Sequence, residues 1–328
     1  MPPLLRVLGL RIEFVESPRK RIHAVNGASL QVWHGEVLGI LGESGSGKST
    51  IARASLRLLS KTAEITEGVI EFEGRDLFRL KEHEMEELRG AQIAMVPQAP
   101  GLALNPVMKV GDQIAEVMRA HRDWSWKRCR QEAGTLLERV YLHSSERRMY
   151  DAYPHQLSGG QQQRVAIAQA LACHPALVIA DEPTASLDSE TEADILKLLC
   201  ELRVEQNMSL LLITHDPKIL LGMADRVAVM YGGRVVEEDR LDRVFREPRH
   251  PYTKALLACT PPAPGQFTRS AGMRLTTIEG SAPDPELIMA GCVFAPRCTE
   301  RLKRCESHAP SSIAVEGGGQ VECFLYGD

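Results

Sequence analysis

The chain has 328 residues, of which 44% are hydrophobic and 25% are charged, and its formal net charge is -4 at pH 7. This length allows a full hydrophobic core and more than one domain, since domains usually hold roughly 100 to 200 residues. The mildly acidic balance gives no basic field of the kind that collects nucleic acid, so nucleic acid is excluded as the expected partner.

The beginning of the chain, up to about Ile40, predicts a β-rich segment. Charged residues at Arg6, Arg11 and Glu13 interrupt the opening before a signal-peptide core forms. No apolar run in the sequence approaches the roughly 20 residues that span a bilayer. We therefore expect a cytoplasmic protein that can dock on a membrane protein.

A phosphate-binding loop is predicted next. The apolar run from Val37 to Leu41 reads as a buried strand, and GESGSGKS, from Gly42 to Ser49, fits G-x-x-x-x-G-K-[ST] before a helical sequence. Glycines let backbone N–H groups turn toward phosphate oxygens, and the helix adds its positive N-terminal dipole. Lys48 is expected to pair with the β and γ phosphates, and Ser49 to ligate Mg²⁺. A glycine turn without a ligand is the alternative, which the strand–turn–helix context disfavours.

Polar and helical sequence follows this loop. The stretch IAMVPQ ends in Gln98, a neutral side chain that can reach Mg²⁺ or an attacking water. From Pro100 to Gln156 the amphipathic stretches IAEVMRAH and QEAGTLLERVYL predict helices. Further on, LSGGQ precedes an apolar helical face: Ser158 is placed as an N-cap, and glycines leave the helix N-terminus bare for an anion. A plain capped helix start is the alternative interpretation.

Two more buried strands are predicted to end at polar residues. The run from Ala176 to Ala180 leads into the acids Asp181 and Glu182, and SLLLIT leads into His215. Ligands gather at the carboxyl ends of parallel strands. Asp181 is expected to hold Mg²⁺ through its water shell, Glu182 to polarise the attacking water, and His215 to contact the γ phosphate. Without the other motifs, the two acids would indicate a solvated loop, and the histidine would indicate a structural role.

Taken together, these motifs resemble those of the ATPase subunits of ABC transporters. In the family's order, the matches are GESGSGKST for the phosphate loop, Gln98 for the Q-loop, LSGGQ for the signature, ALVIADE with its catalytic Glu182, SLD from Ser186 to Asp188 for the D-loop, and His215 for the switch histidine. The resemblance implies an ATPase with an α/β fold. Its P-loop NTPase (RecA-like) core carries a β-rich N-terminal subdomain and a helical subdomain at about 100–157. The cassette is expected over 1–245, followed by a small irregular C-terminal extension over 246–328.

The resemblance also implies which residues serve ATP. Those expected to hold it are Gly42, Glu43, Ser44, Gly45, Ser46, Gly47, Lys48, Ser49, Thr50 and Gln98. Those expected to ligate Mg²⁺ are Ser49, Gln98 and Asp181. Where the family stacks an aromatic ring on adenine, Phe14 is the nearest candidate. Two cassettes pair head to tail in this family, so the signature residues Ser158, Gly159, Gly160 and Gln161 are expected to serve the partner's ATP.

Further phrases narrow the resemblance to the oligopeptide/dipeptide importer group. They are LNP with VGDQI, ADRVAVMYGGRVVE, and HPYTKALL after the cassette. The resemblance implies uptake of di- or oligopeptides at the cytoplasmic face of the inner membrane. The implied partners are a second related ATPase in a heterodimer, two transmembrane permeases and an extracytoplasmic solute-binding protein. Nickel chelates, glutathione or oligosaccharides remain alternative cargoes, and a non-transport ABC ATPase is the alternative of a different class.

Four of the eight cysteines, Cys292, Cys298, Cys305 and Cys323, fall in the last few dozen residues. A reducing cytoplasm disfavours disulfides there. Zinc sites usually need tight C-x₂₋₄-C pairs, which this spacing lacks, whereas longer loops suit a bulkier group. The spacing also resembles the motif that holds a [4Fe-4S] cluster in the tails of these importer ATPases. Zn²⁺ and simple packing of buried thiols are the alternatives; the other four cysteines are interpreted as packing residues.

Overall fold

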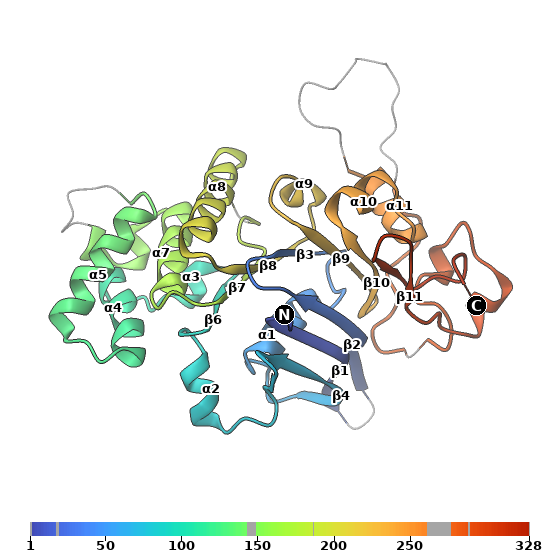
Figure 1. The fold of residues 1–328 in the computed structure, drawn as a ribbon, viewed down its shortest axis with the longest axis horizontal. Helices are drawn as coiled ribbons and strands as arrows, with labels where there is room; N and C mark the ends of the chain where they lie inside the picture. Colours follow the sequence, from blue (N-terminus) through green and yellow to red (C-terminus); the bar gives the residue numbers. More distant parts are fainter. Residues whose placement is uncertain are drawn as a thin grey trace, which may run out of the picture. The chain divides into compact units, whose positions relative to one another are not determined.

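The computed structural model describes residues 2–17, 20–142, 149–185, 187–260, 277–287 and 289–327. Its contacts divide the chain into two compact units, whose elements are labelled in Figure 1. The first unit consists of Met1–Leu4, Val32–Val37 and Glu73–Ile213. The second unit consists of Leu5–Gln31, Leu38–Phe72 and Thr214–Asp328. Each unit therefore joins segments that are far apart in the sequence.

Parallel strands form the centre of the first unit. β6 (Ile93–Val96) pairs with β7 (Leu177–Asp181), and β7 pairs with β8 (Ser209–Thr214). Every residue of β7 and β8 is buried. Burial on both faces explains why LVIAD and SLLLIT are continuous apolar runs rather than alternating ones.

The remaining elements of the first unit are mostly helical. They are β5 (Arg75–Asp76), α2 (Glu82–Leu88), α3 (Pro100–Ala103), α4 (Val110–His121), α5 (Trp126–Arg139), the 3₁₀ turn η1 (Pro154–Gln156), α7 (Gly159–Leu171) and α8 (Ser189–Gln206). Helices α4, α5 and α7 pack on one another (Figure 1). The buried residues of α5 recur with helical spacing, at Cys129, Ala133, Leu136 and Leu137, and so form one apolar face.

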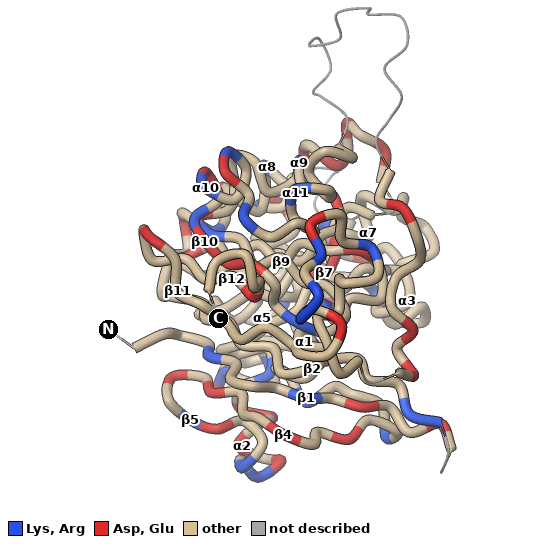
Figure 2. Tube along the Cα trace, turned by 90° about the vertical axis from the view of Figure 1, so that its right-hand side faces the viewer, with Lys and Arg blue, Asp and Glu red and all other residues tan. Residues whose placement is uncertain are grey.

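An antiparallel sheet begins the second unit, with strand order β2-β1-β4. Its strands are β1 (Leu5–Ser17), β2 (Lys20–Val32) and β4 (Ala63–Phe72). Opposite charges face each other across β1 and β4, as in the pair Arg11–Glu67 at 3.0 Å. Figure 2 shows basic and acidic residues interspersed along these strands, which agrees with the mixed charge of the sequence.

A second set of strands in this unit runs from β3, which precedes the phosphate loop, to two short strands near the C-terminus. β3 (Val37–Leu41) runs parallel to β9 (Arg226–Tyr231), which pairs antiparallel with β10 (Arg234–Arg240). β12 (Gln320–Val321) continues the order beside β10, followed by β11 (Ile313–Ala314). The C-terminal extension thus adds strands to a sheet that begins in the predicted cassette.

Short helices complete the second unit. They are α1 (Lys48–Ser55), α9 (Pro217–Leu220), α10 (Leu241–Arg246), α11 (Pro251–Ala258) and the 3₁₀ turns η2 (Ala295–Arg297) and η3 (Lys303–Glu306). Within the described part of the chain, none of the helices combines the length and the apolar character that a membrane crossing requires. The expected α/β fold with a β-rich N-terminal part is confirmed, and residues 261–276 of the extension lie outside the described residues.

Candidate functional site

The phosphate loop, Gly42 to Ser49, connects β3 to α1 in the second unit. Two of its glycines leave no room for a side chain. A Cβ atom on Gly42 would lie 2.2 Å from the carbonyl oxygen of Met230, and one on Gly47 would lie 2.4 Å from that of Ala24. Gly47 also has a φ of 97°, in the left-handed region that favours glycine. Packing against β2 and β9 therefore requires glycine at both positions.

Lys48 begins α1 and turns its ammonium group back under the loop. Its Nζ donates hydrogen bonds to the carbonyl oxygens of Gly42 and Glu43, both at 2.8 Å, and the residue is only 4% exposed. Ser49 and Thr50 follow, half-buried, in the first turn of α1. A buried cation beside the positive end of a helix makes this loop suited to a phosphate group.

The tip of the loop is open to solvent. Ser44 and Gly45 are exposed, while Ser46 is 4% exposed and donates its backbone N–H to the Glu43 carbonyl oxygen at 3.2 Å. Gly45 has a φ of 80°, and a Cβ atom there would meet no atom within 4 Å. The loop thus combines a buried base with an exposed, glycine-containing tip.

The acid pair closes β7 in the first unit. Asp181 is 1% exposed at the end of the strand. Glu182 has a φ of 45°, in the left-handed region, and its N–H donates to the Ile213 carbonyl oxygen at 2.9 Å. The left-handed φ is a strained conformation for a residue with a side chain.

Gln98 is brought to Glu182, although 84 positions separate them in the chain. The Nε2 atom of Gln98 donates a hydrogen bond to Oε2 of Glu182 at 3.0 Å. The amide therefore holds the carboxylate that the sequence analysis assigned to the attacking water. Among the residues predicted for catalysis, these two are in direct contact.

The LSGGQ stretch forms the capped start of α7. The Ser158 hydroxyl accepts the N–H of Gln161 at 3.3 Å, and the Gln161 side chain accepts the N–H of Ser158 at 3.0 Å. This is a capping box, in which two backbone donors at a helix start are satisfied reciprocally. The prediction of an N-cap at Ser158 is confirmed. In this structure LSGGQ is a capped helix start, as the alternative interpretation described it.

Asp188 caps a neighbouring helix, α8. Its carboxylate accepts the backbone N–H of Thr191 at 2.9 Å and the Thr191 hydroxyl at 2.8 Å. These bonds hold the pKa of the Asp188 carboxyl below its ordinary value, the backbone N–H contributing most. The methyl group of Thr191 also lies 2.6 Å from where a Cβ atom on Gly160 would be. The starts of α7 and α8 are thus in close contact; Ser186 lies outside the described residues.

His215 and Phe14 belong to the second unit, with the phosphate loop. His215 is exposed just after β8. Phe14 is half-buried on β1, opposite Ala63 of β4. Glu182, Gln98, Asp181, Asp188 and the LSGGQ residues belong to the first unit.

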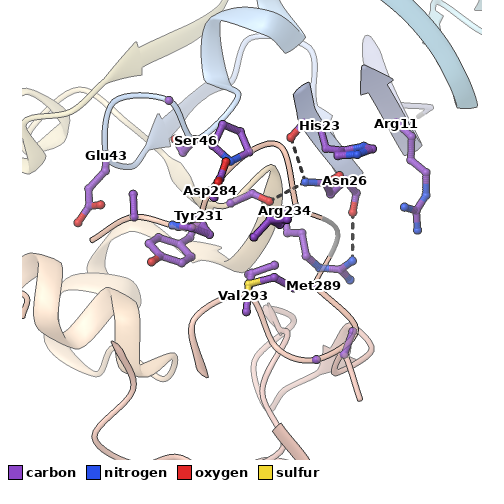
Figure 3. A pocket seen from close by; sticks show the side chains of 18 of the residues that line it. Arg11, His23, Asn26, Glu43, Ser46, Tyr231, Arg234, Asp284, Met289 and Val293 are labelled. Carbon is purple, nitrogen blue, oxygen red and sulfur yellow. Dashed lines mark hydrogen bonds between the residues drawn. The ribbon is translucent and has the colours of Figure 1, made fainter. Parts of the chain in front are cut away.

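A cavity of about 330 Å³ lies beside the phosphate loop, in the second unit. Glu43 and Ser46 line it from the loop, and Tyr231 lines it from the end of β9. Asp284 and Met289 line it from the C-terminal extension, as Figure 3 shows. The extension therefore forms one wall of a cavity that the phosphate loop helps to close.

Two residues that the sequence analysis did not single out contact the phosphate loop. Tyr252 of α11 accepts the N–H of Glu43 through its hydroxyl at 3.0 Å, and Arg297 donates to both Glu43 carboxylate oxygens, at 2.9 and 3.3 Å. They lie 209 and 254 positions from Glu43. No local pattern connects positions so distant, so this contact appears only in the folded chain.

The four tail cysteines line one small cavity of about 20 Å³. Cys292 donates its N–H to the Cys305 carbonyl oxygen at 2.8 Å. Burial raises the pKa of the Cys292 thiol to about 11, and the neighbouring Cys305, Cys323 and Cys298 add to that rise. Within the described ranges, no three His, Cys, Asp or Glu side chains are arranged to hold a single metal ion. The four cysteines thus line a common space.

Family models match two parts of this chain. The model described as ABC transporter matches residues 25–185, and the model described as oligopeptide/dipeptide transporter, C-terminal region, matches residues 236–305. The second match covers α11 and three of the four tail cysteines. Both the phosphate loop and the extension thus have counterparts among known proteins.

Named relatives match nearly the whole chain. The chain is 41% identical to an oligopeptide transport ATP-binding protein of Bacillus subtilis, over 99% of this chain and 98% of that protein. It is 40% identical to a dipeptide transport ATP-binding protein of the same organism, over 99% and 95%.

A solved structure of an ATP-binding cassette, a dimer in a post-hydrolysis state bound to ADP and Pi, resembles this chain. It matches with a TM-score of 0.65 and 30% identity, over 72% of this chain and 98% of the cassette. A cassette from Clostridium perfringens, part of an ABC transporter complex, matches with a TM-score of 0.63 and 29% identity, over 75% and 92%.

Proposed function

The chain belongs to the ABC transporter family as an ATPase subunit of its oligopeptide/dipeptide importer group, and from this premise we propose that it powers the uptake of short peptides. The observation that carries the proposal is the match to two peptide-transport ATP-binding proteins over almost their full lengths, extension included. We propose peptides as the cargo because both relatives are described as peptide-transport proteins.

We propose that the phosphate loop binds the phosphates of ATP. Lys48 now donates to two loop carbonyls, so its Nζ lies where it can exchange these bonds for phosphate oxygens. The residues from Gly42 to Thr50 are proposed to bind the phosphates together with Lys48, although the N–H groups of Glu43 and Ser46 already donate within the protein. Ser49, Gln98 and Asp181 supply oxygen ligands of the kind that Mg²⁺ prefers. When bound, Mg²⁺ neutralises phosphate charge. Phe14 remains the candidate for stacking on adenine.

Hydrolysis is assigned to Glu182. Its carboxylate is the group that would take the proton from the attacking water, and Gln98 donates a hydrogen bond to that carboxylate. His215 is proposed to contact the γ phosphate, where an imidazole can donate a hydrogen bond to an anionic oxygen.

The signature and the D-loop are proposed to serve a second cassette. Ser158, Gly159, Gly160 and Gln161 lie at the start of α7, and an exposed helix start attracts anions. They would complete the ATP site of a partner in a head-to-tail pair, with Asp188 at the start of the adjoining α8. A solved relative is a dimer, which supports this pairing. We propose a heterodimer with a related ATPase.

The chain is proposed to act at the cytoplasmic face of the membrane, bound to two transmembrane permeases that receive cargo from an extracytoplasmic solute-binding protein. An ATPase subunit of an importer must transmit its movement to membrane-spanning partners. Closing of the cassette pair on ATP would drive that movement, and hydrolysis would reopen it.

We also propose that the tail cysteines hold a [4Fe-4S] cluster. All four line one cavity, so one group can reach all of them. The long spacings between the four cysteines disfavour one Zn²⁺ ion, whose sites typically use tight C-x₂₋₄-C pairs. A cubane, whose corners stand apart, fits separated thiolates better.

Uptake into membrane vesicles tests the proposed function. The complex assembled with its permeases and solute-binding protein should accumulate a labelled dipeptide only when ATP is supplied on the cytoplasmic side. Labelled nickel chelate, glutathione and a short oligosaccharide serve as competing cargoes. Uptake of one of these without uptake of peptide would contradict the proposed cargo. Failure to co-purify with permeases would favour a non-transport ATPase.

A further inference from the structure

We infer that Tyr252 and Arg297 of the C-terminal extension are positioning residues that hold the phosphate loop ready for ATP. The inference rests on the nucleotide-binding role proposed above and adds residues outside the expected motifs to that site. Both residues act through Glu43, the second residue of the loop.

Glu43 makes hydrogen bonds through its backbone N–H, its carbonyl oxygen and its carboxylate. Its N–H donates to the Tyr252 hydroxyl at 3.0 Å, and its carboxylate accepts two hydrogen bonds from Arg297. Its carbonyl oxygen accepts the Lys48 ammonium at 2.8 Å and the Ser46 N–H at 3.2 Å. The Glu43 N–H and the Gly42 carbonyl oxygen belong to one peptide group, and that oxygen also accepts the Lys48 ammonium, at 2.8 Å. Tyr252 and the phosphate-binding lysine therefore hold the same peptide group.

Tyr252 is a rigid support for the loop. It is fully buried, and its ring centroid lies 4.4 Å from that of Tyr231 and 5.4 Å from that of Phe294. Phe294 also lines the cysteine cavity. Aromatic contacts of this kind leave the ring one orientation, so the hydroxyl presents a fixed acceptor to Glu43.

Arg297 is equally constrained. Its side chain is 7% exposed, and it donates to the Tyr231 hydroxyl at 3.2 Å as well as to Glu43. Its Nε and Nη2 atoms donate to the carbonyl oxygens of Glu279 and Ile278 at 3.0 and 3.1 Å. A guanidinium whose three nitrogens all donate hydrogen bonds holds a carboxylate in one geometry.

Holding Glu43 in place lowers the entropy cost of ordering the phosphate loop when ATP binds. The loop has an exposed tip that contains a left-handed glycine, and ordering a free loop costs conformational entropy. A loop held in advance binds its ligand more tightly, because less of the binding energy is spent on ordering it. Tyr252 and Arg297 therefore favour ATP binding rather than the proton transfer assigned to Glu182.

Steady-state ATPase measurements on the assembled transporter test this. Tyr252→Phe removes one oxygen and keeps the ring, and Arg297→Gln removes the charge. Each should raise the KM for ATP by about tenfold, as expected for loss of one or two hydrogen bonds, while kcat changes by less than about twofold. Arg297→Lys should restore part of the affinity. Lys254→Gln, which breaks the exposed Lys254–Glu300 pair on α11, is the matched control and should leave KM unchanged.

Hydrogen exchange gives a second readout that does not depend on turnover. Tyr252→Phe should speed exchange at the Glu43 amide, and Lys254→Gln should not. Unchanged KM and unchanged exchange in Tyr252→Phe and Arg297→Gln, in a complex that hydrolyses ATP normally, would overturn the inference. A wild-type complex that neither binds nor hydrolyses ATP would instead refute the proposed function, and the exchange experiment would still report whether the extension holds the loop.

Discussion

At the scale of single residues, Glu182 is one of the described non-glycine residues with a left-handed backbone. A φ of 45° is disfavoured for a residue with a side chain, and it persists here because the N–H bonds Ile213 and the carboxylate bonds Gln98. Backbone strain of this kind is often retained at functional sites, where a side chain must keep one orientation. At Glu182 it accompanies the contact that brings the carboxylate to Gln98.

This geometry predicts the behaviour of Glu182→Gln. The amide cannot accept a proton, so kcat for ATP should fall by about 10²- to 10⁴-fold, the usual contribution of a general base, while ATP binding is retained. Turnover by the assembled complex and equilibrium binding of ATP would be measured in parallel. Glu190→Gln, at an exposed acid in the first turn of α8, makes the same change of charge and should be silent. Normal turnover by Glu182→Gln would remove Glu182 from its assigned role.

At the scale of elements, the starts of α7 and α8 depend on each other. Gly160 has space only for a hydrogen atom, because the Thr191 methyl group occupies the position of a side chain, and Thr191 in turn satisfies Asp188. Gly160 of α7 and Asp188 at the start of α8 are therefore linked through Thr191 within one chain. A shift of either helix start would move the other.

Paired alanine substitutions in the signature test this contact. Gly160→Ala forces Thr191 aside, and overpacking of this kind should lower the thermal melting temperature by about 2 to 6 °C. Gly159→Ala is the control: its Cβ atom would lie 3.8 Å from Leu187, an ordinary contact, so its melting temperature should not fall. Scanning calorimetry on the purified chain measures both. Equal melting temperatures for the two variants would contradict the close contact.

Local patterns predicted the individual elements well, and long-range contacts poorly. The strand before Asp181, the cap at Ser158 and the glycines of the phosphate loop follow from short stretches whose chemistry allows few other conformations. For Gln98 and Glu182, the sequence predicted only that both residues lie near the same ligand, and it did not predict the hydrogen bond between them. The contact of Arg297 with Glu43 could not be predicted, because the 254 positions between them carry no periodic or spacing signal.

At the scale of the whole molecule, the extension combines a strand-forming tail, the cysteine cavity and the supports of the phosphate loop. β12 pairs with β10, and Phe294 lies both in the aromatic group around Tyr252 and at the cysteine cavity. The extension is therefore built into the second unit rather than attached by its ends. The sequence showed its composition, but only the fold shows what it contacts.

Metal analysis addresses the cysteine cavity. Chain purified without oxygen should contain about four iron and four acid-labile sulfide, the content of a cubane cluster. Cys305→Ser removes a thiol from the cavity and should lose both, whereas Cys200→Ser, on α8 and outside the cavity, should lose neither. One zinc per chain without sulfide would contradict the cluster and favour the alternative ion.

The bond between Glu43 and Arg297 has an evolutionary consequence. Because Arg297 is buried, loss of Glu43 alone leaves its guanidinium without a counter-charge, so the two positions should change together among relatives. Tyr252 is under a different constraint. Its hydroxyl meets a backbone N–H, which every residue except proline supplies, so a tyrosine at this position can persist in lineages where the acid at position 43 has been exchanged.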